Sequence, residues 1–295
     1  MTTEILLSGH DFGSSWPKSR EWLLERDAGA RLFVRAAAPS QRGRATVIIT
    51  HGLGEHSGRY GHVAGALVKC GFDVVGWDLR GHGRSSGVRG DLTAYRVFLD
   101  DLREIHRVHA VEGQPVFFFG HSLGGQITLR FLEEQTVSCH GAIVASPWLR
   151  LADDPPWWKL ALARLAMRCW PGFIQNTGNR LELMSRDVAH LASFPDLHLV
   201  HHRISARMYF ALHSAGEQAL AEAEKVKTPL LLLHGDADPV TSHHASCEFL
   251  EKAGSTDKTL RIFPGSRHET HNDLDREQVI REIADWIGAR LTDGP

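Results

Sequence analysis

The sequence has no long apolar run and no excess of charge of either sign. Its apolar stretches, such as residues 116–119 and 230–233, are far shorter than the roughly 18 to 20 residues that a membrane-spanning helix needs. The N-terminus lacks a basic region followed by an apolar run, so it predicts no secretory signal peptide. The formal net charge of -2 provides no basic footprint for nucleic acid. We therefore expect neither a transmembrane segment nor a nucleic-acid partner.

Cysteine is scarce, and its placement excludes two kinds of structure. The four cysteines are scattered without CxxC spacing, which argues against a disulfide framework and indicates a reduced, cytoplasmic protein. The 19 histidines include adjacent pairs at 201–202 and 243–244, but adjacent side chains on a helix point in different directions. No acidic or cysteine partner recurs at ligand spacing. We expect no metal site and no cofactor.

The 295 residues alternate between strand-like and helix-like segments. Short extended stretches at 21–26 and 31–35 flank the turn residues 27–30 and predict a hairpin at an antiparallel edge. Apolar, partly β-branched runs then predict buried strands at 45–50, 73–77, 115–119, 141–145, 229–233 and 260–263. Helical periodicity appears at 62–69, 92–109, 125–135, 243–253 and 278–291. This alternation predicts an α/β fold with a mostly parallel, doubly wound sheet.

The alternation fails once, between residues 147 and 227. These roughly 80 residues carry helical pattern but no convincing strand, and they are too many for a plain loop. We expect an inserted helical cap at 147–227, and a core domain formed by residues 1–146 and 228–295.

The strongest chemical signal is the sequence GHSLGG at residues 120–125. It directly follows a predicted strand and opens a predicted helix, as in the nucleophile elbow of hydrolases. Glycines flank Ser122 because so tight a turn leaves no room for a Cβ at those positions. A glycine-rich turn without function is the bland alternative, and the placement between strand and helix favours a nucleophile.

A serine nucleophile needs a general base, and the base needs an orienting carboxylate. In this fold both follow the serine in the chain, each in a loop after a later strand. The loop after 229–233 contains Asp236 and Asp238, and the loop after 260–263 contains His268 and His271. One member of each pair is expected to be a turn-stabilising or solvated side chain. Spacing alone does not choose between them.

The glycine-rich loop after residues 45–50 supports two interpretations. In a hydrolase, Leu53 and Leu123 would each supply a backbone N–H to the oxyanion. Alternatively, the glycines at 52, 54 and 58, followed by Asp78 at the end of the next strand, imitate a dinucleotide-binding fingerprint. The imitation is partial, because the glycine spacing is G-x-G-x-x-x-G and a hairpin precedes the unit.

These motifs resemble the monoacylglycerol lipase and lysophospholipase group of the α/β-hydrolase superfamily, sometimes grouped with serine aminopeptidases of the S33 kind. The resemblance covers residues 51–60, 78–85, 120–124, 235–238 and 268–272, and the similarity at 183–187 and 199–207 supports the position of the cap. It implies an α/β-hydrolase fold in which Asp238 is the acid and His268 the base. Residues 196–198 read Asp-Leu-His where the group tends to have Asp-Pro-Leu, so the chain departs from the group's pattern in this part of the cap.

The cap begins with aromatic residues, namely Trp148, Trp157 and Trp158, followed by an amphipathic run. Its apolar face could line an acyl pocket or touch a lipid surface, or it could pack on the core as ordinary interior. For a single tryptophan, packing is the commoner outcome. For the cap as a whole, the resemblance implies contact with an acyl chain and transient contact with a membrane surface.

Together these features predict a serine ester hydrolase that uses Ser122, His268 and Asp238 and forms an acyl-enzyme. The expected substrate is a small acyl ester such as a monoacylglycerol or a lysophospholipid. Peptide or amide cleavage is the nearest enzymatic alternative, and a binding protein that keeps the fold without turnover is the alternative from another class.

Overall fold

The computed structural model describes residues 4–6, 16–178 and 180–291. Residues 1–3 and 7–15, which include most of the N-terminus expected to carry no signal peptide, lie outside the described residues. Within the described ranges, no helix is both long and apolar enough to cross a membrane.

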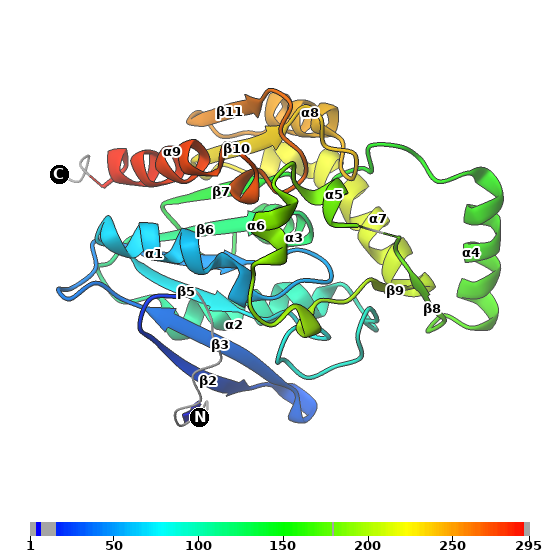
Figure 1. The fold of residues 1–295 in the computed structure, drawn as a ribbon, viewed down its shortest axis with the longest axis horizontal. Coiled ribbons are helices and arrows are strands. Elements are labelled where there is room, and N and C mark those ends of the chain that lie inside the picture. Colours follow the sequence, from blue (N-terminus) through cyan, green and yellow to red (C-terminus); the bar gives the residue numbers. More distant parts are fainter. Residues whose placement is uncertain (1–3, 7–15, 179, 292–295) are drawn as a thin grey trace.

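A single twisted sheet of nine described strands forms the centre of the molecule (Figure 1). In spatial order the strands are β1 (Glu4–Leu6), β2 (Ser19–Glu25), β3 (Arg31–Ala37), β5 (Asp73–Trp77), β4 (Thr46–Thr50), β6 (Val116–His121), β7 (Gly141–Ala145), β10 (Leu230–Gly235) and β11 (Lys258–Phe263). Pairing is antiparallel from β1 to β5 and parallel from β5 to β11. The hairpin edge and the parallel sheet are both confirmed.

Helices cover both faces of the sheet because successive strand residues point to opposite faces. On β4, for example, Ile48 belongs to one hydrophobic cluster while Val47 and Ile49 belong to the other. The first cluster contains residues from α2 (Arg96–His109), α3 (Leu123–Glu133) and α8 (His243–Lys252), whereas the second contains residues from α1 (Gly61–Lys69) and α9 (Arg276–Ala289). The strands are thus buried on both sides, which explains their continuous apolar runs.

The strand order places a crevice between β4 and β6. The chain leaves β4 toward β5 on one side, and it leaves β6 toward β7 on the other. The loops after these two neighbouring strands therefore diverge, and ligands of open α/β sheets bind at such a switch point. Both the loop that begins at His51 and the turn that carries Ser122 lie at this position.

The segment 147–227, which we call the cap segment, separates β7 from β10. It contains α4 (Trp157–Cys169), β8 (Ile174–Asn176), α5 (Leu181–Met184), α6 (Val188–Ala192), β9 (Arg203–Ser205) and α7 (Ala206–Glu222). The expectation that this segment has no strand is wrong, because β8 and β9 pair antiparallel. Three-residue strands are too short to show a period-2 pattern in the sequence.

The two long helices of the cap segment differ in their packing. Helix α7 lies against α3 and buries Met208 and Leu212 in the main core cluster. Helix α4 has no buried residue and stands away from the sheet (Figure 1). The tryptophans of α4 therefore do not pack on the core, although packing is the commoner outcome for a single tryptophan.

Candidate active site

Ser122 lies between the end of β6 and the start of α3, in a strained backbone conformation with φ 52° and ψ -114°. Such a conformation costs on the order of 1–3 kcal/mol and persists where the surroundings enforce it. The neighbouring glycines are required by contact: a Cβ on Gly120 would lie 2.5 Å from the carbonyl oxygen of Gly124, and one on Gly124 would lie 2.1 Å from that of Thr50. The strand, the tight turn and the helix have the geometry of a nucleophile elbow.

The structure brings Ser122, Asp238 and His268 together from three separate loops. The Nε2 atom of His268 lies 3.0 Å from the Ser122 hydroxyl oxygen, and its Nδ1 atom lies 2.8 Å from Oδ2 of Asp238. All three residues are almost fully buried: Ser122 is 5% exposed, Asp238 7% and His268 4%. The three groups therefore form one continuous hydrogen-bonded chain.

Asp238 accepts hydrogen bonds from its own loop as well as from His268. The backbone N–H groups of Val240 and Thr241 donate to Oδ1 at 2.7 and 3.1 Å, and the Thr241 hydroxyl donates to Oδ2 at 2.8 Å. His234 Nε2 lies 3.0 Å from Oδ2. Burial would raise the pKa of Asp238, but His268 and the hydrogen bonds from His234 and His268 hold this pKa well below its usual range. The carboxylate is thus ionised and fixed in direction.

His268 is buried beside this carboxylate. Burial would lower the pKa of the imidazole, but the charge and hydrogen bond of Asp238 outweigh it, so the pKa of His268 is raised above its usual value. A base whose protonated form is stabilised in this way can accept a proton from a serine hydroxyl.

The two competing side chains have different positions. Asp236 is exposed, as expected for a solvated loop side chain, and its Oδ1 accepts a hydrogen bond from the N–H of Gly265 in the neighbouring loop at 2.6 Å. His271 is fully buried and stacks on Tyr60 with ring centroids 5.0 Å apart. A solvated His271 was expected as one possibility, and that expectation is wrong. Burial holds the pKa of His271 well below its usual value.

The loop after β4 lies directly against the elbow. A Cβ on Gly52 would come within 3.1 Å of the Ser122 Cβ. Leu53 follows Gly52 and lines the cavity described below, and its N–H has no acceptor among the described residues. Leu123 begins α3, where the first N–H groups of a helix have no acceptor within the helix. Leu53 and Leu123 therefore each carry a backbone N–H without an acceptor among the described residues.

Asp78 is not free for a dinucleotide. Its carboxylate accepts hydrogen bonds from the N–H groups of Ser57 and Arg84, both at 2.8 Å, and the residue is 1% exposed. The acid that the fingerprint would direct to a ribose is used to hold two loops together. Among residues 4–6, 16–178 and 180–291, no group of three or more His, Cys, Asp or Glu side chains is placed to hold a metal ion.

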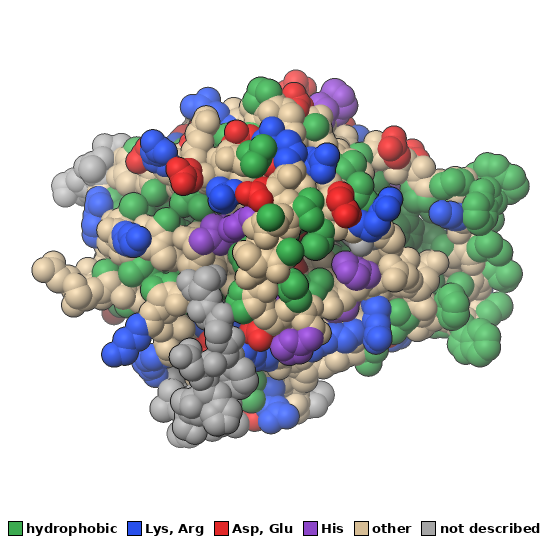
Figure 2. Space-filling model, viewed as in Figure 1, with side chains coloured by type: hydrophobic (Ala, Val, Ile, Leu, Met, Phe, Trp, Pro, Cys, Tyr) green, Lys and Arg blue, Asp and Glu red, His purple; other side chains and the backbone are tan. Residues whose placement is uncertain are grey.

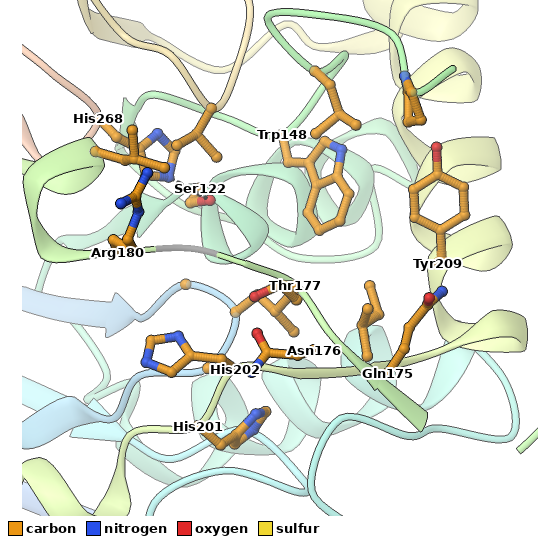
Figure 3. Close-up of a pocket in the computed structure, with 18 of the residues that line it drawn as sticks. Ser122, Trp148, Gln175, Asn176, Thr177, Arg180, His201, His202, Tyr209 and His268 are labelled. Carbon is orange, nitrogen blue, oxygen red and sulfur yellow. Dashed lines mark hydrogen bonds between the residues drawn. The ribbon is translucent and has the colours of Figure 1, made fainter. Parts of the chain in front are cut away.

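A cavity of about 1000 Å³ opens over Ser122 and His268 (Figure 3). Trp148 and Trp158 line it, whereas Trp157 is outside the lining and 80% exposed. The apolar part of the wall is formed largely by the cap segment, through Leu151, Leu160, Leu162, Leu165, Trp170 and Phe173. The polar part includes Gln175, Asn176, Thr177, Arg180, His201 and His202. In Figure 3, Arg180 lies on the same side of the cavity as His268, while Tyr209 lies on the far side.

The exposed face of α4 is unusually apolar for a surface. Figure 2 shows hydrophobic side chains gathered where α4 projects from the body. The exposed large hydrophobic residues of this region are Trp157, Trp158, Leu162, Leu165, Met167, Trp170 and Phe173. Exposed apolar patches of this kind mark sites of binding to apolar surfaces or partners.

Several residues that complete the site have no clear signal in the sequence. Thr241 and His234 hold Asp238, and Glu55, Arg59 and Glu269 form a buried ion network beside the cavity. For the ion network, the sequence offers one indication of a role in the site: Glu55 and Arg59 lie in the glycine-rich loop, and Glu269 directly follows His268.

Comparison with known proteins assigns the chain to a family. Residues 41–275 match the family described as serine aminopeptidase, S33. The chain belongs to this family. The predicted resemblance is therefore confirmed.

This S33 member is similar to lipases over most of its length. It is 29% identical to a monoacylglycerol lipase of Mycolicibacterium smegmatis over 89% of the chain and 95% of that protein. It is 36% identical to an uncharacterized abhydrolase domain-containing protein of Dictyostelium discoideum, but it spans only 28% of that protein's length. The crystal structure of a Paleococcus ferrophilus monoacylglycerol lipase matches with a TM-score of 0.77 and 34% identity, over 87% of this chain and 99% of that one. These matches confirm the α/β-hydrolase fold and place the protein among the lipases and esterases of that fold.

Proposed function

We propose that this protein hydrolyses carboxylic esters that carry one acyl chain, with Ser122 as nucleophile, His268 as general base and Asp238 as the orienting acid. The observation that carries the proposal is the continuous chain from Asp238 Oδ2 through His268 to the Ser122 hydroxyl, at 2.8 and 3.0 Å, which opens into the cavity. A serine hydroxyl is a weak nucleophile until such a base can accept its proton.

The proposed reaction has two halves. Ser122 Oγ attacks the ester carbonyl carbon while His268 Nε2 takes the hydroxyl proton, and the N–H groups of Leu53 and Leu123 bind the oxygen that becomes negative. The same proton then passes from His268 to the departing alcohol, which leaves an acyl-enzyme. Water, deprotonated by His268, attacks the acyl carbon; His268 then returns this proton to Ser122 Oγ as the bond between Oγ and the acyl carbon breaks, which releases the acid and free Ser122. Asp238 keeps the Nδ1 proton of His268 directed toward itself and stabilises the imidazolium.

The two parts of the cavity wall support a substrate with an apolar and a polar portion. The leucines and aromatic residues of the cap segment provide a surface for an acyl chain, and burying each methylene contributes about 0.8 kcal/mol. Arg180, on the side of His268, can donate to oxygen atoms of the departing alcohol. Glycerol hydroxyls and a glycerophosphate both present such oxygens, so we propose a monoacylglycerol or a lysophospholipid as substrate.

The division into a core (residues 1–146 and 228–295) and a cap (147–227) is part of this proposal. The exposed apolar face of α4 would contact aggregated lipid and admit an acyl chain to the cavity beneath. The relatives named above as monoacylglycerol lipases support the choice of substrate.

Covalent labelling with a fluorophosphonate tests the nucleophile. Wild-type protein should be labelled at Ser122, while Ser122→Ala should not be labelled and His268→Ala should react far more slowly. Labelling of Ser122→Ala at the wild-type rate, or an unreactive wild type, would refute the proposal, and the second outcome would favour a binding protein.

A substrate panel tests the ester class. Monoacylglycerols and lysophospholipids of graded chain length should be hydrolysed, with kcat/KM rising as the acyl chain grows. Aminoacyl anilides serve as the comparison, because the family description names aminopeptidases. A preference for the anilides would overturn the lipase interpretation.

A further inference from the structure

A buried ion network joins two loops that are far apart in the chain. The Arg59 guanidinium contacts the Glu269 carboxylate twice, at 3.0 and 2.8 Å, and contacts Glu55 at 2.8 Å. The side chains of Arg59, Glu55 and Glu269 are 6%, 5% and 3% exposed. A buried ion pair is weak evidence for stability, because the free energy lost on dehydrating the two charges offsets much of their attraction. Its two-point geometry, in contrast, fixes the relative position of the groups that carry it.

One end of the network holds the loop after β4. Glu55 Oε1 accepts a hydrogen bond from the N–H of Gly52 at 2.6 Å and from the Tyr60 hydroxyl at 2.8 Å, and it lies 3.0 Å from His121 Nδ1. Gly52 immediately precedes Leu53, whose N–H is a proposed oxyanion donor. Glu55 therefore anchors the residue that directly precedes this donor.

The carbonyl of Gly52 is held as well. The N–H of Leu79 donates to Nε2 of His51 at 3.0 Å, so the neutral ring carries its proton on Nδ1, which lies 2.8 Å from the Gly52 oxygen. Because the peptide unit is planar, fixing the Gly52 carbonyl also fixes the direction of the Leu53 N–H. Burial lowers the pKa of His51, which keeps the ring neutral and this hydrogen-bond pattern intact.

The other end of the network holds the loop of the proposed base. Glu269 directly follows His268, and its Oε2 also accepts a hydrogen bond from Asn272 Nδ2 at 2.6 Å. The Glu269 N–H donates to the Met184 carbonyl of the cap segment at 2.8 Å. Glu269 is thus fixed by Arg59, by its own loop and by the cap segment.

We infer that the Arg59–Glu269 ion pair is a clamp that sets the position of His268 relative to the Leu53 N–H, so that Arg59 and Glu269 are positioning residues for the reaction. Proton transfer and oxyanion binding must occur around one carbonyl group, while the two loops that supply them are 210 residues apart. The inference rests on the proposed function, because it assigns these residues to the same Ser122 centre.

Steady-state kinetics of Glu269→Gln and Arg59→Lys test the clamp. Each variant breaks the two-point contact while changing little volume, and each should lower kcat by about 10- to 100-fold. KM should stay within about threefold. The loss should be the same for p-nitrophenyl acetate, which has no glycerol head group, as for a monoacylglycerol. Glu282→Gln, which breaks the exposed Arg261–Glu282 pair, is the matched control and should leave kcat unchanged.

A double-variant cycle distinguishes one shared clamp from two independent contributions. If both residues act through the same contact, the Arg59→Lys/Glu269→Gln protein should lose about as much kcat as either single variant. A multiplied loss would contradict the clamp. Thermal unfolding of every variant gives the folded fraction by which kcat is normalised.

The pH profile supplies a signature that a purely structural role would not produce. The titratable groups that face His268, directly or through a neighbour, are Asp238, His234, His121, Glu55 and Glu269. The Glu269 charge is one of the contributions that raise the pKa of His268, so Glu269→Gln should move the acid limb of kcat/KM to lower pH. Arg59→Lys keeps its charge and should leave that limb in place.

The outcomes separate this inference from the proposed function. A wild type without ester hydrolysis or fluorophosphonate labelling would overturn both. An active wild type with Glu269→Gln at wild-type kcat would overturn the clamp alone. A rise in KM confined to monoacylglycerols, with kcat unchanged, would show that Arg59 and Glu269 bind the head group instead of positioning His268.

Discussion

Separate substitutions of the two histidines of one loop should distinguish a residue needed for catalysis from a residue needed for stability. His268 and His271 lie three residues apart, and both are buried, but only His268 contacts Ser122. His271 packs against Tyr60 and Phe119, with ring centroids 5.0 and 5.8 Å away. Its two ring nitrogens have no hydrogen-bond partner among the described residues. The first histidine should therefore matter for turnover, and the second for packing.

The magnitudes follow from these contacts. His268→Ala should lower turnover by about 10⁴- to 10⁶-fold, as expected for loss of a general base. His271→Ala removes a buried ring and should reduce the free energy of unfolding by about 3 kcal/mol. For a chain of this length that is a fall of about 6 to 9 °C in Tm. Turnover per folded molecule should stay within about threefold of wild type.

His271→Phe is the matched control, because it keeps a ring on Tyr60 and replaces two buried nitrogens that have no partner in the described part of the chain. Its Tm should stay within about 3 °C of wild type. The assays are calorimetric unfolding and ester hydrolysis normalised to folded protein. If His271→Ala lost about 1000-fold in turnover while keeping its Tm, the assignment of the base to His268 would be wrong.

Three other changes give distinct results. Asp238→Asn should lower kcat by about 10⁴-fold with little change in KM, measured on a soluble ester, because the amide favours the wrong imidazole tautomer; an active variant would contradict the assigned acid. Burial lowers the pKa values of His56 and His62 to about 4, so below pH 6.5 the unfolded chain binds protons that the folded chain excludes. Each of these two histidines should lower the free energy of unfolding by up to about 2 kcal/mol between pH 7 and pH 5. The midpoint of urea unfolding should fall accordingly, and a midpoint that does not change between pH 7 and pH 5 would refute this. Trp157→Ser and Met167→Ser, at exposed positions outside the cavity lining, should leave Tm and soluble-ester kinetics unchanged while slowing hydrolysis of aggregated monoacylglycerol; equal loss on both substrates would exclude a surface-contact role.

The core strands were predictable because burial on both faces leaves a direct pattern in the sequence. The expected strands at 73–77 and 141–145 coincide with β5 and β7, and the one expected at 45–50 differs from β4 by one residue. The cap segment was less predictable for the same physical reason. Strands β8 and β9 have three residues each, and neither alternates between buried and exposed positions, so no period-2 pattern in the sequence selects their residues.

Within the site, the chain order placed a nucleophile, an acid and a base in successive loops, but it could not choose between side chains of one loop. Asp236 and Asp238 are two residues apart, and the direction of each depends on the turn between them. That turn is stabilised by the neighbouring loop, through the Gly265 N–H on Asp236. The direction of the two side chains therefore depends on local contacts of Asp238 with Val240 and Thr241 and also on a contact of Asp236 across 29 residues, which no local pattern contains.

The sequence by itself determined the alternating elements, the strained turn at Ser122 and the strand ends after which polar side chains follow. These features depend on periodicity and on backbone preferences that extend over a few residues. Only the tertiary structure decided which side chains meet. The hydrogen bond between Ser122 and His268 and the ion pair between Arg59 and Glu269 join residues 146 and 210 positions apart. Such contacts exist only once the parallel sheet has brought the ends of β4, β6, β10 and β11 to one edge, because neighbouring parallel strands present their following loops on the same side.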